Sequence, residues 1–194
     1  MEIFPGAKIV CPSIGTGSYG EVFKAVDPST HELLAIKTMR TGSRNSDIDH
    51  EFNMQQKCSP HRNICAINYI ADGPEEKTRS LVMEFAGTPL SSVRELRLNE
   101  SMLKCVAHQL FNGIAHMHKN GVVHRDIKTN NLMVDYCGTV RICDFGFAGI
   151  VGPKLGSQDT PDYVVTENYR PPEMLMGATN HGYVYSLFSL IYSL

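Results

Sequence analysis

A chain of 194 residues is long enough for one sizeable hydrophobic core or for two small lobes. Its net charge of -2 leaves no electrostatic footprint for nucleic acid or for an anionic membrane surface. No apolar run reaches the roughly 18 residues of a membrane-spanning helix, and Met1 to Val10 shows no secretory signal. We therefore expect a cytoplasmic or nuclear protein with no nucleic-acid or membrane partner.

The chain contains six cysteines, a number that could indicate disulfides or a zinc site. None of them forms a Cys-x-x-Cys pair, and none has a histidine at the spacing of a zinc finger. We expect reduced thiols that are mostly buried.

The first third of the sequence has the alternating apolar pattern of antiparallel strands, with turn residues between the segments. One segment differs, because Asp47 and Asp49 near its start and Ser59-Pro60 after its end are typical of a helix. The expected strands are Lys8–Ile14, Glu21–Val26, Glu32–Met39, Ala66–Ala71 and Ser80–Phe85, and the expected helix is Ser46–Cys58.

The pattern changes after a break at Gly87-Thr88-Pro89. From Asn99 to Lys119, apolar residues recur at the 3.6-residue period of a long helix with one buried face. Two short strands are expected at Leu132–Val134 and Thr139–Ile142, and a long irregular stretch follows from Phe145 to Pro172. The sequence thus predicts a strand-rich part, a break, and a mainly helical part.

Gly15-Thr16-Gly17-Ser18-Tyr19-Gly20 has the spacing G-x-G-x-x-G, and Val22 follows it. Glycines at this spacing let backbone amides approach a polyphosphate closely. The motif alone is a weak signal, because it also marks the strand-to-helix turn of dinucleotide-binding folds. Here it lies between two expected strands, which favours a hairpin that covers phosphates.

Lys37 follows Ala35 and Ile36 on the third expected strand. A lysine among apolar neighbours costs free energy unless an anion receives it. A surface lysine that extends its ammonium into solvent is the alternative.

The strongest signal is the run from His124 to Asn131, with the spacing H-R-D-x-K-x-x-N. Asp144-Phe145-Gly146 and Arg170-Pro171-Pro172-Glu173 come later in the chain. Phosphoryl transfer requires a carboxylate for the hydroxyl proton, a cation near the moving phosphoryl group, and oxygen ligands for magnesium. These motifs contain all three kinds of group.

With these motifs, the sequence resembles the eukaryotic protein kinases from about Ala7 to about Met176. The resemblance implies ATP and Mg²⁺ as cofactors and protein substrates with serine or threonine hydroxyls. It implies that Asp126 is the catalytic base and that Lys128 lies beside the γ-phosphate. Asn131 and Asp144 would bind the metal.

By the same resemblance, Lys37 would bind the α- and β-phosphates, and Glu51 would pair with Lys37. Met83 would be the gatekeeper, and Glu84-Phe85-Ala86 would be the hinge that receives adenine through backbone hydrogen bonds. The full set of implied nucleotide-binding residues is Ile14, Gly15, Gly17, Gly20, Val22, Ala35, Lys37, Glu51, Met83, Glu84, Ala86, Asn131 and Asp144.

Two features narrow the resemblance. The lysine at position 128 is the residue that the serine/threonine branch carries at this place. The segment from Val164 to Glu173 is similar to the cyclin-dependent and mitogen-activated kinase group, and Tyr163 falls where mitogen-activated kinases carry a phosphorylated tyrosine. A possible regulatory protein partner follows from this likeness.

Several residues depart from the family pattern. Gln55 stands where an apolar residue is usual, one turn after Glu51. Cyclin-dependent kinases bind an activation-loop phosphothreonine, here Thr160, with three arginines. Arg125 matches one of them.

His50 and Gly149 stand at the other two arginine positions. Tyr183 replaces the aspartate that begins the next helix, and the chain ends at Leu194, so we expect an incomplete C-terminal lobe.

The sequence therefore predicts a two-lobed α+β fold. Residues 1–86 would form an N-terminal lobe with an antiparallel sheet and one helix, and residues 87–194 a mainly helical, incomplete C-terminal lobe. The predicted function is a serine/threonine protein kinase. The alternatives are a catalytically weak or inactive scaffold that binds ATP, and an incomplete product that does not fold alone.

Overall fold

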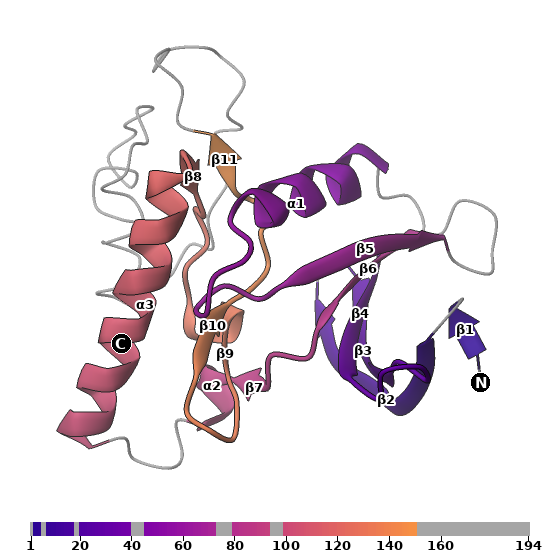
Figure 1. The fold of residues 1–194 in the computed structure, drawn as a ribbon, viewed down its shortest axis with the longest axis horizontal. Helices are drawn as coiled ribbons and strands as arrows, with labels where there is room; N and C mark the ends of the chain where they lie inside the picture. The colour runs from indigo at the N-terminus through magenta and orange to yellow at the C-terminus, as the bar shows by residue number, and fades with distance from the viewer. Residues whose placement is uncertain are drawn as a thin grey trace.

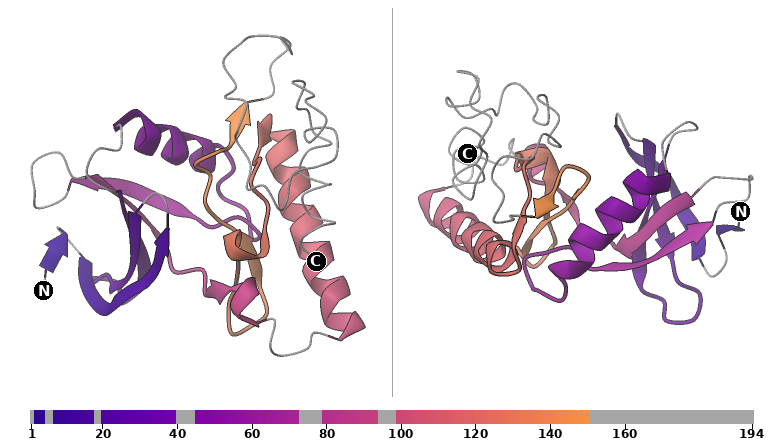
Figure 2. Two further views of the ribbon diagram at one scale, coloured as in Figure 1. Left: turned by 180° about the vertical axis from the view of Figure 1, so that it is seen from behind. Right: turned by 90° about the horizontal axis from the view of Figure 1, so that it is seen from above.

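The computed structural model of the chain describes residues 2–4, 7–17, 20–39, 45–72, 79–93 and 99–150. These residues form two parts, one built on a large sheet and the other around a long helix (Figure 1). The turned views in Figure 2 show the same division. The two parts are connected by the segment between strand β6 (Arg79–Glu84) and strand β7 (Thr88–Pro89). The predicted two-lobed α+β fold is confirmed.

The first part is a six-stranded antiparallel sheet in the order β1-β2-β3-β4-β6-β5. Its remaining strands are β1 (Glu2–Phe4), β2 (Ala7–Gly17), β3 (Gly20–Val26), β4 (Leu33–Met39) and β5 (Ile67–Asp72). All five strands predicted from alternation are present, although β2 runs to Gly17 instead of ending at Ile14. Alternation predicts them well because successive side chains of a strand point to opposite faces. Ala25, Ile36 and Val82 are among the fully buried ones.

Helix α1 (Asn45–Lys57) contacts strands β5 and β6 of this sheet (Figure 1). Its buried side chains include Ile48 and Met54, as expected for an amphipathic helix. They also include Glu51 and Gln55, which lie one turn apart and are almost completely buried. Apolar burial alone therefore does not hold this helix, and its polar inner residues need partners.

The second part is organised around helix α3 (Glu100–Lys119), which the 3.6-residue period predicts almost to the residue. Asn99 caps its N-terminus, because its side-chain oxygen accepts a hydrogen bond of 3.0 Å from the amide of Met102. The buried face of the helix, which includes Leu110 and Met117, joins a core that contains Phe145.

Short elements complete this part. The predicted strands are present as β9 (Leu132–Val134) and β10 (Val140–Ile142). Elements that the sequence did not reveal are β7, which pairs with β9, and β8 (Val122–Val123), which pairs with β11 (Gly149–Ile150). Helix α2 (Leu90–Val93) and the 3-10 helix η2 (Thr129–Asn131) were also not predicted.

Gly87 lies in the connection between the two parts, between β6 and β7. Its φ is +110°, a conformation that side-chain-bearing residues rarely adopt. A Cβ atom there would lie 2.1 Å from the carbonyl oxygen of Val134. The connection can therefore approach strand β9 only with glycine at this position. The predicted boundary between residues 86 and 87 falls inside this connection.

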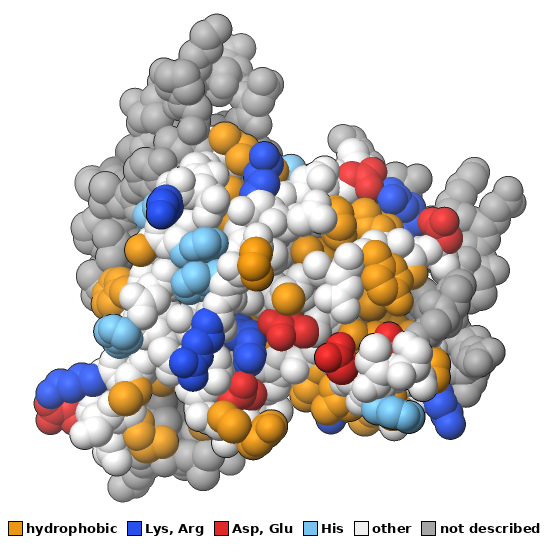
Figure 3. Space-filling model, viewed as in Figure 1, with side chains coloured by type: hydrophobic (Ala, Val, Ile, Leu, Met, Phe, Trp, Pro, Cys, Tyr) orange, Lys and Arg blue, Asp and Glu red, His pale blue; other side chains and the backbone are white. Residues whose placement is uncertain are grey.

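All six cysteines carry free thiols, in agreement with their spacing. Within the described ranges, no helix is long and apolar enough to cross a membrane. On the face shown in Figure 3, acidic and basic side chains are interspersed among polar and hydrophobic ones.

Gln55 provides a test of the packing between α1 and the sheet. Its Nε2 donates a 2.8 Å hydrogen bond to the carbonyl oxygen of Cys65, and its buried Oε1 has no hydrogen-bond partner among the described residues. We expect Gln55→Glu to destabilise the protein by about 3 kcal/mol or more, because a buried carboxylate would face the Cys65 carbonyl and lie one turn from Glu51. Urea unfolding at neutral pH measures this loss.

The matched control is Gln56→Glu, since Gln56 is the exposed neighbour on the same helix. Its effect should stay within about 0.5 kcal/mol. Equal effects of the two substitutions would contradict the buried placement of Gln55.

Candidate functional site

The glycine-rich segment is a hairpin between β2 and β3, as its position between two strands predicts. Gly15 pairs with Val22, and Gly17 pairs with Gly20. Gly20 has a φ of +153°, and a Cβ atom there would lie 1.8 Å from the carbonyl oxygen of Thr38 on β4. Glycine at position 20 thus lets the hairpin lie against β4. Because the segment joins two strands, the alternative of a strand-to-helix turn is wrong.

Lys37 lies on β4 and points inward, with 12% of its side chain exposed. Its Nζ contacts Glu51 of α1 at 2.7 Å to Oε1 and 2.9 Å to Oε2. It also contacts Oδ1 of Asp144 at 2.7 Å. The predicted Lys37–Glu51 pair is present, and the alternative of a solvent-exposed surface lysine is wrong. Elements far apart in the sequence meet at this ammonium.

The protonation states of this cluster follow from burial and charge. Burial acts to lower the pKa of Lys37, but Glu51 and Asp144 outweigh it and raise that pKa above its ordinary value. Burial raises the pKa of Glu51, and Lys37 offsets only part of the rise. For Asp144, burial acts to raise the pKa, but Lys37 outweighs burial and the pKa lies below its ordinary value. Asp144 is therefore the carboxyl that holds its negative charge most firmly.

Asp126 lies in the loop between β8 and η2, where its backbone and side chain are held on several sides. The Oδ2 atom is 2.8 Å from Nζ of Lys128 and accepts a 2.9 Å hydrogen bond from Nδ2 of Asn131. The same Nδ2 donates to the backbone carbonyl of Asp126 at 2.9 Å. The three predicted residues Asp126, Lys128 and Asn131 are thus brought together.

His124 connects this loop to the segment that carries Asp144. Its Nε2 donates to the carbonyl oxygen of Cys143 at 3.0 Å, and its Nδ1 accepts from the amide of Asp126 at 3.2 Å. Burial lowers the pKa of His124, which fits a neutral ring in this role. The ring also packs edge-on against Phe145. His124 therefore positions both acidic residues of the site.

Asn131 and Asp144 have the chemistry of a magnesium site. Cys143, the neighbour of Asp144, donates its amide to the carbonyl oxygen of Asn131 at 2.9 Å, which holds the two segments together. Because Nδ2 of Asn131 is used by Asp126, its amide oxygen is the atom that a cation would contact. Within the described ranges, no group of three or more acidic, histidine or cysteine residues forms a complete metal site. The residues therefore fit Mg²⁺ held jointly with phosphate oxygens, as is usual for this ion.

The residues expected around adenine lie on strands of the sheet and in the segment that follows β6. Ala35 pairs with Met83 across β4 and β6, and both belong to a buried cluster with Ala86 and the half-buried Val22. Ile14 on β2 is 44% exposed. These positions provide apolar walls of the kind that small-molecule sites require.

Arg125, His50 and Gly149 are adjacent in the structure, as their place in the resemblance implies. A Cβ atom at Gly149 would lie 2.5 Å from Cζ of Arg125, so glycine leaves room for the guanidinium. Nε2 of His50 donates to the carbonyl oxygen of Ala148 at 2.8 Å. Residues Ser157, Thr160, Tyr163, Glu173 and Tyr183 lie outside the described residues.

Sequence reasoning missed several polar residues that support the site. Asn63 donates Nδ2 to the carbonyl oxygen of Val140 at 2.9 Å and to Oε1 of Gln109 at 3.2 Å. Arg141 contacts Glu84 and Asp135. No periodicity or motif marks these residues, because partners such as Val140 for Asn63 and Glu84 for Arg141 are far away in the sequence.

Comparison with known proteins shows which family this chain is similar to. The family described as "Protein kinase domain" matches residues 10–194. Cyclin-dependent kinase G1 of Arabidopsis thaliana is 30% identical over 188 residues, which cover 91% of this chain and 30% of that protein. Cyclin-dependent kinase C-2 C of the same plant is 35% identical over 186 residues, covering 91% of this chain and 28% of that protein. CTD kinase subunit alpha of Saccharomyces cerevisiae (strain ATCC 204508 / S288c) is 33% identical over 177 residues, covering 87% and 32%.

This chain belongs to the protein kinase family. The likeness to the cyclin-dependent group, predicted from the sequence, is confirmed by these relatives. The chain spans between 28% and 32% of the length of these three curated relatives.

Lys37→Met should reveal how far the buried carboxyls depend on their cation. Removing the ammonium leaves Glu51 and Asp144 side by side, and we expect a loss of about 3 kcal/mol or more near neutral pH. The loss should shrink as pH falls toward about 5. Without Lys37 the already raised pKa of Glu51 rises further, so the folded protein takes up a proton that restores stability below the folded pKa.

Urea unfolding of wild type and variant between about pH 5 and about pH 8 measures this trend. Lys104→Met is the control, because it removes only the exposed Lys104–Glu100 pair on α3. A loss in Lys37→Met that does not change with pH would contradict the electrostatic account.

Proposed function

We propose that this chain is a serine/threonine protein kinase that transfers the γ-phosphoryl group of magnesium-ATP to hydroxyl groups of protein substrates. The main support is the contact of Asp126 with both Lys128 and Asn131, described above, within the loop that His124 connects to Asp144. This grouping provides a carboxylate, a cation and oxygen donors within one small region. Phosphoryl transfer requires these groups together and little else from the protein.

In the proposed reaction, Asp126 accepts the proton of the substrate hydroxyl while the hydroxyl oxygen forms a bond to the γ-phosphorus. The bond from that phosphorus to the β,γ-bridging oxygen breaks, and ADP leaves. Lys128, whose Nζ contacts Asp126, would offset charge on the moving phosphoryl group. Magnesium held by Asn131 and Asp144 would neutralise the phosphates when bound.

The nucleotide would lie under the β2–β3 hairpin. Lys37, oriented by Glu51, would bind the α- and β-phosphates. Adenine would contact the hinge residues Glu84 and Ala86 and the apolar wall that includes Met83.

Partners are inferred from the relatives. Two of the relatives described above are named as cyclin-dependent kinases, and we infer that a regulatory protein also controls this chain. Protein substrates follow from the proposed reaction. A cytoplasmic or nuclear location stays a prediction from the sequence.

Asp126→Asn tests the catalytic role. The amide keeps an oxygen that accepts from Asn131 but cannot take up the hydroxyl proton, so we expect transfer to fall on the order of 10²–10⁴-fold with nucleotide affinity nearly unchanged. Radiolabelled ATP with a basic protein substrate measures transfer, and calorimetry with magnesium-ATP measures binding.

Glu100→Gln is the matched control, because that carboxylate is exposed on α3. Equal transfer by wild type and Asp126→Asn would contradict the assigned role. Binding of magnesium-ATP by the wild-type chain without transfer would favour the alternative of an ATP-binding scaffold.

A further inference from the structure

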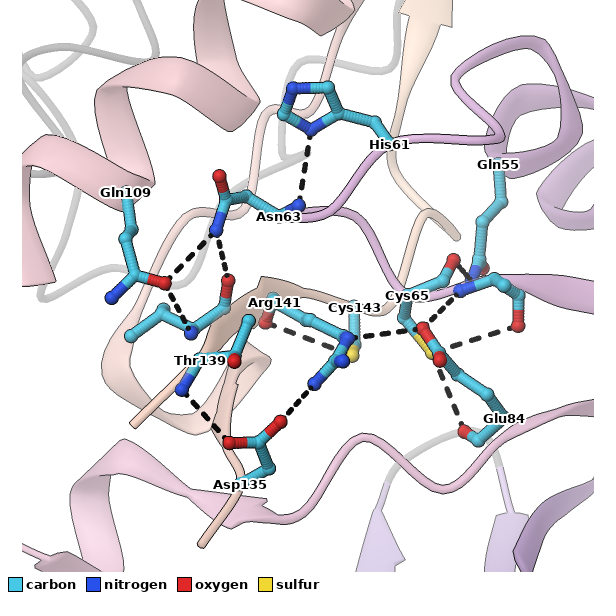
Figure 4. Close-up of polar contacts among 12 residues, drawn as sticks. Gln55, His61, Asn63, Cys65, Glu84, Gln109, Asp135, Thr139, Arg141 and Cys143 are labelled. Carbon is cyan, nitrogen blue, oxygen red and sulfur yellow. Dashed lines mark hydrogen bonds and ion pairs between the residues drawn. The ribbon is translucent and has the colours of Figure 1, made fainter. Parts of the chain in front are cut away.

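Arg141 forms a second ionic connection between the two parts of the molecule, in addition to the contact of Lys37 with Asp144. It lies on β10, and its Nε is 3.3 Å from Oε1 of Glu84 at the end of β6. Its Nη1 is 2.8 Å from Oδ2 of Asp135. Only 21% of the Arg141 side chain is exposed. Figure 4 shows the guanidinium placed between the two carboxylates.

Both carboxylates that face Arg141 are fixed in place. Oε1 of Glu84 also accepts a 2.7 Å hydrogen bond from the amide of Ala66, and the amide of Glu84 donates to the carbonyl oxygen of Ala66 at 3.0 Å. Oδ1 of Asp135 accepts from the amides of Cys137 and Thr139, each at 2.9 Å. Because both carboxylates are held by backbone amides, the guanidinium meets them without much loss of side-chain freedom.

The segment around Ala66 is itself bonded to the second part. The amide of Ile142 donates to the carbonyl oxygen of Asn63, and the amide of Cys65 donates to the carbonyl oxygen of Ile142, each at 3.0 Å. Figure 4 shows Arg141, Glu84 and Cys65 in one set of polar contacts and Asn63 in a neighbouring set with Gln109 and His61. The end of β6 is therefore connected to β10 both by backbone hydrogen bonds and by an ion pair.

We call the contact of Lys37 with Asp144 the front connection and the contact of Arg141 with Glu84 the rear connection. The two differ in whether their atoms belong to groups assigned to phosphate or metal. At the front, Lys37 contacts Oδ1 of Asp144, and a magnesium ion bound to Asp144 would place a second cation on the same carboxylate. At the rear, none of the atoms that join Arg141 to Glu84 belongs to a group assigned to phosphate or metal. The rear connection can therefore persist while the front one rearranges.

We propose that Arg141 is a positioning residue for nucleotide binding, which holds the Glu84 side chain and thereby fixes the hinge backbone that receives adenine. The inference rests on the proposed function and deepens it. Without Arg141, the hinge would sample more orientations in the free protein, and binding would have to order it. The variant should bind nucleotide more weakly.

The experiment compares the binding of a non-hydrolysable ATP analogue with magnesium, adenylyl-imidodiphosphate, by calorimetry. Arg141→Met should weaken binding about five- to tenfold, the range of a charge-assisted contact. Arg141→Lys should recover part of the affinity, because a single ammonium can contact one of the two carboxylates. Glu84→Gln keeps an acceptor for the Ala66 amide but lacks the charge, and it should weaken binding without adding to Arg141→Met in the double variant.

The chain offers a matched control in Arg79→Met. Arg79 is similarly exposed, at 24%, and also faces two acids, at 3.0 Å to Asp49 and 3.8 Å to Asp72. All three of these residues lie in the first part of the molecule. Arg79→Met should leave the affinity unchanged, because neither Asp49 nor Asp72 belongs to the hinge.

The outcomes separate this inference from the proposed function. Failure of the wild-type chain to bind the analogue would contradict the proposed function itself. If the wild-type chain binds the analogue and the folded variants Arg141→Lys, Glu84→Gln and Arg141→Met bind it with the same affinity, the role of Arg141 is overturned. An equal loss of affinity in Arg79→Met would show a general stability effect and would also overturn it.

Discussion

The buried ammonium of Lys37 is the interaction on which the rest of the site depends. A cation at this depth costs several kcal/mol unless carboxylates receive it, and here Glu51 and Asp144 do so. Glu51 comes from α1, whose inner face is partly polar and therefore needs this charge to hold its position. Asp144 comes from the second part, so one ammonium contacts a helix, a sheet and the segment that we propose to bind metal.

The same interaction makes the front of the site changeable. Asp144 contacts Lys37 through Oδ1, and the same carboxylate is the proposed ligand of a magnesium ion, so binding of that ion would change the charges around Lys37. A site that rearranges at its front needs fixed contacts elsewhere. The hydrogen bonds of Asn63 with β10 and α3 provide such contacts, because their partners are carbonyl and amide groups that we assign to neither nucleotide nor metal. The contacts of Asn63 can therefore stay fixed while the contact of Lys37 with Asp144 changes.

The sequence predicted the parts whose signals are local. Alternation gave the long strands, the 3.6-residue period gave α3, and the spacing around Asp126 gave the site. It did not predict β8 and β11, because two-residue strands have no period and exist only where distant segments meet. It also missed Arg141 and Asn63, whose importance comes from partners such as Glu84 and Val140 that lie more than a helix length away in the chain. Long-range polar contacts leave no pattern in a single sequence.

The departures from the family pattern differ in their physical consequences. Gly149 replaces an arginine, yet its missing side chain gives the Arg125 guanidinium its place. His50 replaces another arginine, and its ring bonds to the carbonyl oxygen of Ala148. Gln55 is different, because one of its two polar atoms is satisfied and the other is buried without a hydrogen-bond partner in the part of the chain that the structure describes. An unpaired acceptor beside Glu51 costs free energy in the element that must hold Lys37. The inner face of α1 is therefore a place where the described site carries an energetic cost.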